Sequence, residues 1–300
     1  MQVVILASTG GWHTDELVRA VSARGLVPLL LPWEGNVGRM GEAAGISNAG
    51  HLLHRARAVL PRIIPGGSLE QIIYRVDTLH RLEEAGVRVM NSARAIERTV
   101  DKAWTSAILE EAGLPTPDTV ACETPEAAFE AFRAMGDVVV KPLFGSMGMG
   151  MSRVTDEDMA WRVFRVIETI RGVYYLQRFI PHGGRDIRVF VVGERVLGAI
   201  ERRSEGWRTN FSRGGRVASI TLPAAWADLA LRAARAVGAE YAGVDLLPSE
   251  DGRIHVLEVN GIPGWEGLQK ATSIDVAGAV VDQLLSVTRR ATRTGRQLAT

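Results

Sequence analysis

Residues 242–264 read AGVDLLPSEDGRIHVLEVNGIPG, and the interpretation of the whole chain starts from this stretch. Two apolar runs flank a cluster of turn-forming residues at 248–252, which predicts two strands joined into a hairpin. Glu258 and Asn260 are two positions apart, so an extended chain turns both side chains to one face. Asp245, on the preceding strand, is expected to come opposite them. The hairpin therefore brings together two carboxylates and one amide oxygen.

A cluster of this kind is typical of a divalent cation site. Two carboxylates repel each other unless a cation lies between them, and an all-oxygen ligand set suits Mg2+ or Mn2+. The alternative is a solvated hairpin face with ordinary surface acids. Leu257 and Val259 favour the metal site, because they indicate a buried strand on which an unpaired acid would be costly.

Arginines are dense on the segments that precede the hairpin. Strands are expected over residues 174–180, 186–192 and 195–201, and Asp186 and Arg188 alternate with apolar residues, so both point to one face. A guanidinium binds phosphate or carboxylate in a bidentate fork, so this set predicts an anion site; surface arginines that only aid solubility are the alternative. The set consists of Arg188, Arg202, Arg203, Arg208 and Arg213.

A lysine and a glycine-rich loop follow one another in the middle of the chain. Residues 138–141 predict an apolar strand that ends in Lys141, at the end of a sheet where ligands of α/β domains bind. Residues 145–150, GSMGMG, offer backbone N–H groups to a phosphate. Met151 stands where a Walker A loop needs its lysine, so a P-loop is excluded. Lys102 lies just before a predicted helix, and its position alone indicates an ordinary surface lysine. The prediction of Lys141 at a ligand site raises the alternative that Lys102 belongs to the same site.

The start of the chain predicts an open α/β domain. A strand at residues 3–7, a helix over 14–23 and a strand at 27–31 form a unit of the kind that builds parallel sheets. Gly10 and Gly11 lack the third glycine and the acid of a dinucleotide fingerprint, so we interpret them as structural. The remaining expectations for this region are strands at 59–64 and 87–90, a helix over 68–85, and a glycine-rich loop over 35–50.

Four more helices are expected, over residues 103–112, 157–171, 224–237 and 275–286, followed by a basic tail that we expect to be frayed. The single cysteine, Cys122, is expected in a loop with no obvious His partner, so it is not a candidate nucleophile.

Composition narrows the class of protein. The chain has 300 residues, 46% of them hydrophobic and 23% charged, which is ordinary for a globular protein of two or three domains. Its formal net charge of +1 gives no general attraction to nucleic acid or to anionic membranes. No signal peptide and no apolar run long enough to span a bilayer is evident. We therefore expect a cytoplasmic protein with a small-molecule partner.

Taken together, these motifs resemble the ATP-grasp superfamily and, within it, the RimK-like ligases that attach an amino acid, commonly L-glutamate, to a carboxyl group. The resemblance extends over residues 91–282. It rests on DKAWT at 101–105, VVVKP at 138–142, GSMGMG at 145–150, LQRFI at 176–180, GRDIRVFVVG at 184–193, AIERR at 199–203, WRTNFSRGG at 207–215, AGVDLL at 242–247 and LEVNGIPGWEGLQKATSIDVA at 257–277.

The resemblance implies an α+β ATP-grasp fold in three parts. These are an N-terminal Rossmann-like pre-ATP-grasp α/β domain at residues 1–94, a central ATP-grasp subdomain with the glycine-rich loop at 95–172, and a C-terminal subdomain with the metal site at 173–286. Residues 287–300 form the basic tail.

The resemblance also implies roles for individual residues. Asp245, Glu258 and Asn260 match the metal ligands, and Lys141, Arg188 and Arg202 match catalytic positions, with Arg188 expected to hold the acyl phosphate and the oxyanion. The resemblance implies that residues 177–180 line the adenine pocket through their backbone. Arg178 departs from the family, which usually has an acid there, so a side-chain contact from that position is in doubt. The implied ATP-binding residues are Lys102, Lys141, Gly145, Ser146, Gly148, Gln177, Arg178, Phe179, Ile180, Asp186, Arg208, Thr209 and Asn210.

The implied reaction is the attack of a carboxylate on the γ-phosphate of ATP, with two Mg2+ or Mn2+ ions, to give an acyl phosphate that an amine opens. The resemblance favours a small-molecule cofactor as the acceptor, such as a tetrahydromethanopterin-type pterin or a deazaflavin; a peptide or a protein C-terminus is the alternative. A nucleotide-binding protein without ligase activity and a dinucleotide-dependent oxidoreductase are the competing functions. The resemblance further suggests a homodimer or homotetramer.

Overall fold

The structure is a computed structural model that describes residues 1–7, 10–41, 44–145, 148–209 and 216–286. The chain divides into two compact units. The first unit comprises Met1–Arg94 and a second segment that starts at Asp275, and the second unit comprises Ala95–Ile274. Within the described ranges, no helix combines the length and the apolar character that crossing a membrane requires.

A four-stranded parallel sheet in the order β2-β1-β6-β7 forms the centre of the first unit. Val3, Val4, Ile5 and Leu6 of β1 are all buried, as expected for a strand covered on both faces. This sheet confirms the predicted α/β domain. The elements of the unit's first segment are β1 (Gln2–Leu6), α1 (Trp12–Ser22), β2 (Val27–Leu31), β3 (Asn36–Arg39), β4 (Gly45–Asn48), β5 (His51–Leu52), β6 (Ala58–Pro61), α2 (Leu69–Glu84) and β7 (Arg88–Val89).

The loop predicted over residues 35–50 is wrong. β3 pairs antiparallel with β4, which pairs with β5, so this segment forms a second small sheet. Its glycines allow close packing: a Cβ on Gly35 would lie 2.5 Å from Oδ1 of Asn48, and one on Gly45 would lie 2.8 Å from the ring of His54. Glycine in a strand often marks such a close approach, and a count of glycines cannot separate it from a loop.

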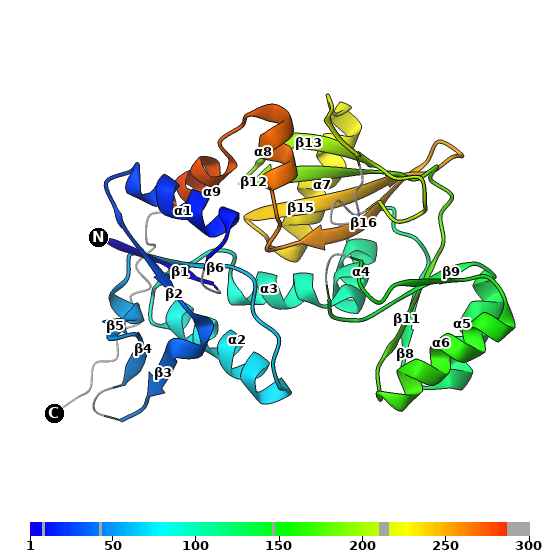
Figure 1. Cartoon of the computed structure of the whole chain (residues 1–300), viewed down its shortest axis with the longest axis horizontal. Coiled ribbons are helices and arrows are strands. Elements are labelled where there is room, and N and C mark those ends of the chain that lie inside the picture. The colour runs from blue at the N-terminus through cyan, green and yellow to red at the C-terminus, as the bar shows by residue number, and fades with distance from the viewer. Residues whose placement is uncertain (8–9, 42–43, 146–147, 210–215, 287–300) are drawn as a thin grey trace. The chain divides into compact units, whose positions relative to one another are not determined.

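The last described helix, α9 (Val276–Ser286), belongs to the first unit. It contacts α1 and β6, and Figure 1 shows it beside α1. Asp282 of this helix accepts a 2.6 Å hydrogen bond from Nε of Arg24. The helix therefore lies outside the C-terminal ATP-grasp segment predicted at residues 173–286. Spacing along the chain does not show which unit an apolar helix packs against. The predicted tail lies outside the described residues.

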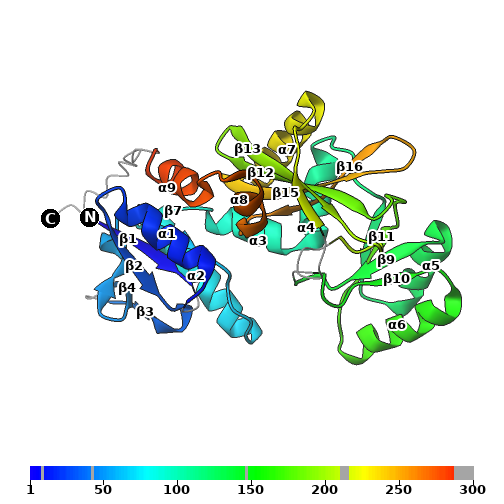
Figure 2. The same cartoon turned by 45° about the horizontal axis from the view of Figure 1, so that its top comes forward.

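The second unit contains a four-stranded sheet in the order β10-β9-β11-β8. One face of the sheet packs on α5 and α6, which lie together beside it in Figure 2. Val138, Val140 and Leu176 point to this core, so the alternate residues Val139, Lys141 and Gln177 point to the opposite face. The elements are β8 (Thr119–Cys122), α5 (Pro125–Met135), β9 (Val138–Lys141), β10 (Ser152–Val154), α6 (Glu157–Thr169) and β11 (Tyr174–Arg178).

Helix signals explain the position of α5, which the sequence analysis did not predict. Thr124 caps the helix through a hydrogen bond from the backbone N–H of Ala127, and Pro125 occupies the first turn. Cys122 ends strand β8 and packs partly buried against the core, so its predicted place in a loop is wrong.

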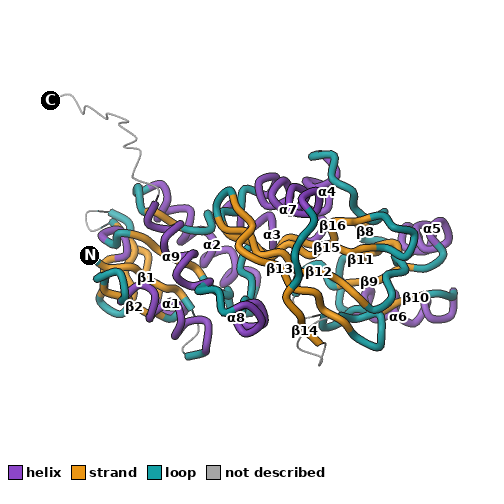
Figure 3. Tube along the Cα trace, turned by 90° about the horizontal axis from the view of Figure 1, so that it is seen from above, coloured by secondary structure: helices purple, strands orange, loops and turns teal. Residues whose placement is uncertain are grey.

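A five-stranded antiparallel sheet in the order β14-β13-β12-β15-β16 completes the second unit. One face is covered by α7, with Leu109 of α4 in the same core, and Figure 3 shows both helices on one side of this sheet. The elements are α3 (Ala93–Val100), α4 (Lys102–Glu111), β12 (Arg185–Val192), β13 (Arg195–Arg203), β14 (Arg216–Ser219), α7 (Ala224–Val237), β15 (Tyr241–Pro248), β16 (Ile254–Asn260) and α8 (Glu266–Thr272).

Candidate active site

The predicted hairpin is confirmed, and it brings the two acids together. β15 pairs with β16 so that Asp245 lies directly opposite Glu258, and Gly243 lies opposite Asn260. The register shifts after Asp245, because Leu246 pairs with Val256 and Leu257 is left as an extra residue. Such a bulge re-aims the side chains that follow it.

The bulge decides which face Glu258 occupies. Val256 belongs to the core under α7, and strict alternation would turn Glu258 toward the same core. The extra residue instead turns Glu258 to the face that carries Asp245. This feature could not be predicted from the spacing of apolar residues alone.

Asp245 is held by two arginines. Arg188 donates to it twice, from Nε to Oδ1 and from an Nη to Oδ2, both at 2.7 Å. Arg202 lies 3.0 Å from Oδ2. Burial would raise the pKa of Asp245, yet the charges of Arg188 and Arg202 outweigh it and lower that pKa to about 2. The carboxylate is therefore ionised throughout the physiological range.

Arg202 bridges Asp245 to Asp186. Its guanidinium donates to both carboxylate oxygens of Asp186, at 2.6 and 2.7 Å, and the hydroxyl of Thr209 donates to the same carboxylate. Asp186 is 3% exposed and Arg202 is 4% exposed. The structure thus places the predicted ATP ligand Asp186 and the predicted catalytic Arg202 in one buried ion pair, although cross-strand pairing of the two was not foreseen.

The third candidate metal ligand, Asn260, is next to both groups. With its amide oxygen turned to Arg188, that oxygen accepts at 3.1 Å from an Nη, and the amide nitrogen donates to Glu258 at 2.9 Å. Asp245, Glu258 and Asn260 therefore offer oxygen atoms on one face of the hairpin, which fits a hard divalent cation. Among the described residues, no group of three or more His, Cys, Asp or Glu side chains is arranged to hold a metal ion, so a cation here depends on the amide oxygen as well as the two acids.

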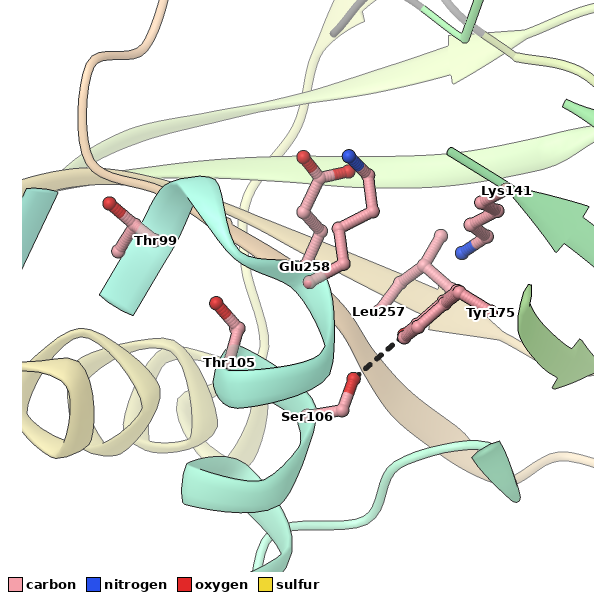
Figure 4. Close-up of a pocket in the computed structure, with 8 residues that line it drawn as sticks. Thr99, Thr105, Ser106, Lys141, Tyr175, Leu257 and Glu258 are labelled. Carbon is pink, nitrogen blue, oxygen red and sulfur yellow. Dashed lines mark hydrogen bonds between the residues drawn. The ribbon is translucent and has the colours of Figure 1, made fainter. Parts of the chain in front are cut away.

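Lys141 and Glu258 come from different sheets and line the same small pocket (Figure 4). The ammonium of Lys141 donates to Oε1 of Gln177 at 2.5 Å and lies 5.9 Å from the centre of the Tyr175 ring. Burial lowers the pKa of Lys141 to about 8, against the opposing effect of Glu258. The other residues that line the pocket are Thr99, Lys102, Thr105, Ser106, Tyr175 and Leu257.

Lys102 joins this pocket to the base of the glycine-rich loop. Its ammonium donates to the carbonyl oxygen of Gly145 at 2.8 Å and to that of Leu143 at 3.4 Å. Burial lowers the pKa of Lys102, while the charge of Glu258 raises it. Gly145 and Gly148 have φ angles of 136° and 66°, which favour glycine. Ser146 lies outside the described residues.

The segment predicted to line the adenine pocket, residues 177–180, has part of its backbone committed inside the protein. The N–H groups of Arg178 and Phe179 donate to the carbonyl oxygens of Asp118 and Asp137. The side chain of Arg178 forms a 2.8 Å ion pair with Asp118. A backbone contact to a nucleotide would therefore come from the carbonyl groups of this segment or from Ile180.

Arg208, one of the implied ATP-binding residues, lies beside the aromatic ring of Trp207. Its guanidinium carbon lies 4.7 Å from the centre of the Trp207 ring, and an Nη donates to the carbonyl oxygen of Met151. Arg208 thus contacts the residue that directly follows the glycine-rich stretch. Asn210 and Arg213 lie outside the described residues.

The sequence analysis missed Tyr175, Ser106, Thr99 and Thr105. Tyr175 and Gln177 are two positions apart on an apolar strand, so their shared face was open to prediction. The helix residues Thr99, Thr105 and Ser106 carry no comparable signal, because polar residues on a helix are most often solvated.

A family model and curated relatives both identify RimK-like ATP-grasp proteins as similar to this chain. Residues 99–284 match the family model of the RimK-like ATP-grasp domain. The tetrahydromethanopterin:alpha-L-glutamate ligase of Methanosarcina acetivorans is 34% identical over 310 residues, covering 92% of this chain and 96% of the relative. A probable alpha-L-glutamate ligase of Citrobacter koseri is 32% identical over 94% of both chains.

Solved structures share the fold. The ATP-grasp ligase PsnB, in complex with a phosphomimetic variant of its minimal precursor, Mg and ADP, superposes with a TM-score of 0.75 at 25% identity, covering 95% of this chain and 97% of PsnB. A RimK domain protein from Sphaerobacter thermophilus has a TM-score of 0.75 at 23% identity, covering 95% of this chain and 100% of its own, which supports the fold alone.

Proposed function

Because this chain belongs to the RimK-like ATP-grasp family, we propose that it is an ATP-dependent carboxylate–amine ligase that joins L-glutamate to a carboxyl group of a small-molecule cofactor. The relatives named as tetrahydromethanopterin:alpha-L-glutamate ligases, together with their coverage of nearly the whole chain, favour a pterin-type acceptor. A peptide acceptor is less well supported, since the structures with precursor peptides are more distant in sequence.

One observation carries the proposal: two lysines and a carboxylate line one pocket. Lys102 and Lys141 supply positive charge for the phosphates of ATP, and Glu258, which lines the same pocket, would supply a carboxylate ligand for a divalent cation. The neighbouring Asp245 and Asn260 complete the ligand set. Burial lowers the pKa values of both lysines, which means that their charged forms are disfavoured. An anion bound beside them would stabilise those charged forms.

We assign the chain's own residues as follows. Lys102 and Lys141 hold the phosphates while the acceptor carboxylate attacks the γ-phosphorus, ADP leaves, and an acyl phosphate forms. The neutral glutamate amine then attacks the acyl carbon, phosphate leaves, and the proton lost by the nitrogen passes to the departing phosphate or to solvent. A bound Mg2+ would supply charge neutralisation on the transferring phosphoryl group.

Arg188 is our candidate for stabilising the oxyanion that forms during the amine attack. Its bidentate pair with Asp245 fixes the guanidinium plane, and its side chain keeps 21% exposure toward solvent. A cation held rigidly before the reaction stabilises developing charge without reorganisation. Arg202, by contrast, is committed to two carboxylates, so we assign it to holding Asp186 and Asp245 in place.

The test is ADP release from MgATP by the full-length chain, with a panel of amino acids against pterin, deazaflavin and peptide acceptors, followed by product mass. We expect turnover only with a carboxylate acceptor and an amino acid together, and a mass increase of one glutamyl residue per addition. ATP binding without turnover on any pair would favour a non-catalytic nucleotide-binding protein. Turnover on a peptide with no activity on pterins would replace the proposed acceptor.

Three finer points belong to the same proposal. We propose two divalent ions, with Mn2+ able to replace Mg2+, which metal titration of turnover would test. A homodimer or homotetramer is expected, which sedimentation velocity would test. Residues 95–172 supply the lysines and residues 173–274 supply the metal ligands, a division that mutagenesis of each segment would test.

A further inference from the structure

The side chain of Gln177 holds the ammonium group of Lys141. Gln177 is only 2% exposed, and its Oε1 lies 2.5 Å from Nζ of Lys141. Both residues project from the face of the four-stranded sheet opposite α5 and α6, because Val139 pairs with Gln177 and Lys141 pairs with Tyr175. The backbone role expected for Gln177 in an adenine pocket does not involve this contact.

The orientation of the Gln177 amide follows from its partners. An ammonium group can only donate, so the oxygen of the amide must face Lys141. The nitrogen then donates to the hydroxyl of Thr119 at 3.0 Å and to that of Tyr175 at 3.4 Å. Thr119 gives its own proton to the carbonyl oxygen of Pro117 at 2.8 Å, which leaves its lone pairs free to accept. Backbone, threonine, glutamine and lysine thus form one directed chain of hydrogen bonds.

Tyr175 connects this chain of hydrogen bonds to helix α4. Its hydroxyl is hydrogen-bonded to that of Ser106 at 2.8 Å, as Figure 4 shows. Burial raises the pKa of Tyr175, so the phenol stays neutral near Lys141. Gln177, Thr119 and Ser106 are also neutral. The hydrogen bond that holds the ammonium of Lys141, and the groups that support it, are therefore neutral, although the charges of Glu258 and Lys102 act on it across the pocket.

A neutral partner matters for the chemistry. A carboxylate at this distance would fix Lys141 equally well but would form an ion pair and compete with a phosphate for the ammonium. Resting on the proposed function, we propose that Gln177, anchored by Thr119, is a positioning residue that holds Lys141 for the phosphates of ATP without neutralising it.

The test compares Gln177→Met with Gln177→Glu in the full-length chain. Binding of the ATP analogue AMPPNP with Mg2+ is measured by calorimetry, and the KM values for ATP and for the amino acid are measured separately. We expect each variant to weaken AMPPNP binding and raise the KM for ATP by about tenfold, because each alters a charge-assisted contact to the ammonium. The KM for the amino acid is expected to stay within about twofold, since that substrate does not contact Lys141 in this scheme.

Thr119 supplies a matched pair of second variants. Thr119→Val removes the hydroxyl while keeping the shape, and we expect a rise of about threefold in the KM for ATP; Thr119→Ser restores the hydroxyl and the wild-type value. Cys122→Ala, on the same strand but the opposite face, controls for general disturbance of the sheet.

The outcomes separate this inference from the proposed function. Wild-type nucleotide affinity in either folded Gln177 variant, with Lys141→Met impaired, overturns the inference and leaves the ligase proposal intact. Equal loss for ATP and for the amino acid, or a failure of Thr119→Ser to restore binding, also overturns it by indicating a structural role only. A wild-type chain that binds no nucleotide overturns both.

Discussion

Two sets of buried charged side chains, one on each sheet of the second unit, are held in opposite ways. On the five-stranded sheet, Asp245 and Asp186 are each gripped by a guanidinium in bidentate geometry. On the four-stranded sheet, Lys141 is held by the neutral amide of Gln177. The first arrangement neutralises charge within the protein, whereas the second leaves a positive charge for an external anion.

The difference shows in the pKa values of the two groups. The arginines lower the pKa of Asp245 to about 2 in spite of burial. The ammonium of Lys141 donates instead to the neutral amide of Gln177, and burial lowers the pKa of Lys141 to about 8. Asp245 keeps its ionised form because paired charges outweigh its burial, whereas for Lys141 burial outweighs the charge of Glu258. The carboxylates paired with arginines are therefore fixed in their charge, whereas the charge of Lys141 can change with pH.

The largest predicted effect removes the bridging guanidinium of the five-stranded sheet. Arg202→Met leaves the buried carboxylate of Asp186 without its ionic partner, and we expect the free energy of unfolding to fall by about 3–5 kcal/mol. Urea denaturation followed by circular dichroism measures it. Arg203→Met is the control, because that side chain is 59% exposed and its loss should cost less than about 1 kcal/mol. Equal effects in the two variants would contradict the buried-pair account.

The next prediction concerns the carboxylate that faces the lysines. Glu258→Gln keeps the size of the side chain but removes its charge, and we expect turnover to fall about a hundredfold or more, because the proposed metal ligand is lost. Coupled ADP release measures it. Glu250→Gln, in the turn of the same hairpin, should keep wild-type turnover. Full activity of Glu258→Gln would refute the metal assignment.

The lowered pKa of Lys141 predicts that the KM for ATP depends on pH. As pH rises through about 8, Lys141 loses its proton, and we expect the KM for ATP to rise roughly fivefold between pH 8 and pH 9. Steady-state kinetics across this range measures it. Lys141→Arg keeps its charge at these pH values, so its KM should rise less than that of the wild type. A wild-type profile as flat as that of Lys141→Arg would show that Lys141 does not titrate in this range.

The same shift has a consequence for stability. The folded pKa of about 8 lies below the ordinary value of 10.5, so the folded chain binds fewer protons than the unfolded chain between these values. The contribution of Lys141 to the free energy of unfolding therefore rises with pH across that window. Comparing wild type with Lys141→Met by urea denaturation at pH 8 and pH 10 isolates it.

The smallest predicted effect lies at the edge of the four-stranded sheet. Arg178 pairs with Asp118, and their side chains are 39% and 68% exposed. Arg178→Ala should change the free energy of unfolding by less than about 1 kcal/mol and leave the KM for ATP unchanged. Denaturation and kinetics on one preparation test both. A large rise in the KM for ATP would instead assign the side chain to the nucleotide site.

Local patterns were enough to predict the hairpin and its acids. Proline, serine, aspartate and glycine at residues 248–252 mark a turn between apolar runs, and the structure confirms Asp245 opposite Glu258. The same reasoning failed over residues 35–50, where glycines serve close packing in a small sheet. It also failed for Cys122, because a strand of four residues carries too little periodicity to be recognised.

The sequence by itself determined the family, the order of the main elements and the identity of the charged residues, because these depend on motifs and on periodicity along the chain. Only the tertiary structure decided which charges meet. The bulge at Leu257 turns Glu258 away from the core, cross-strand pairing joins Arg202 to two acids, and Gln177 reaches Lys141 from a neighbouring strand. Each of these depends on register between distant segments, and register is set by packing that no single segment contains.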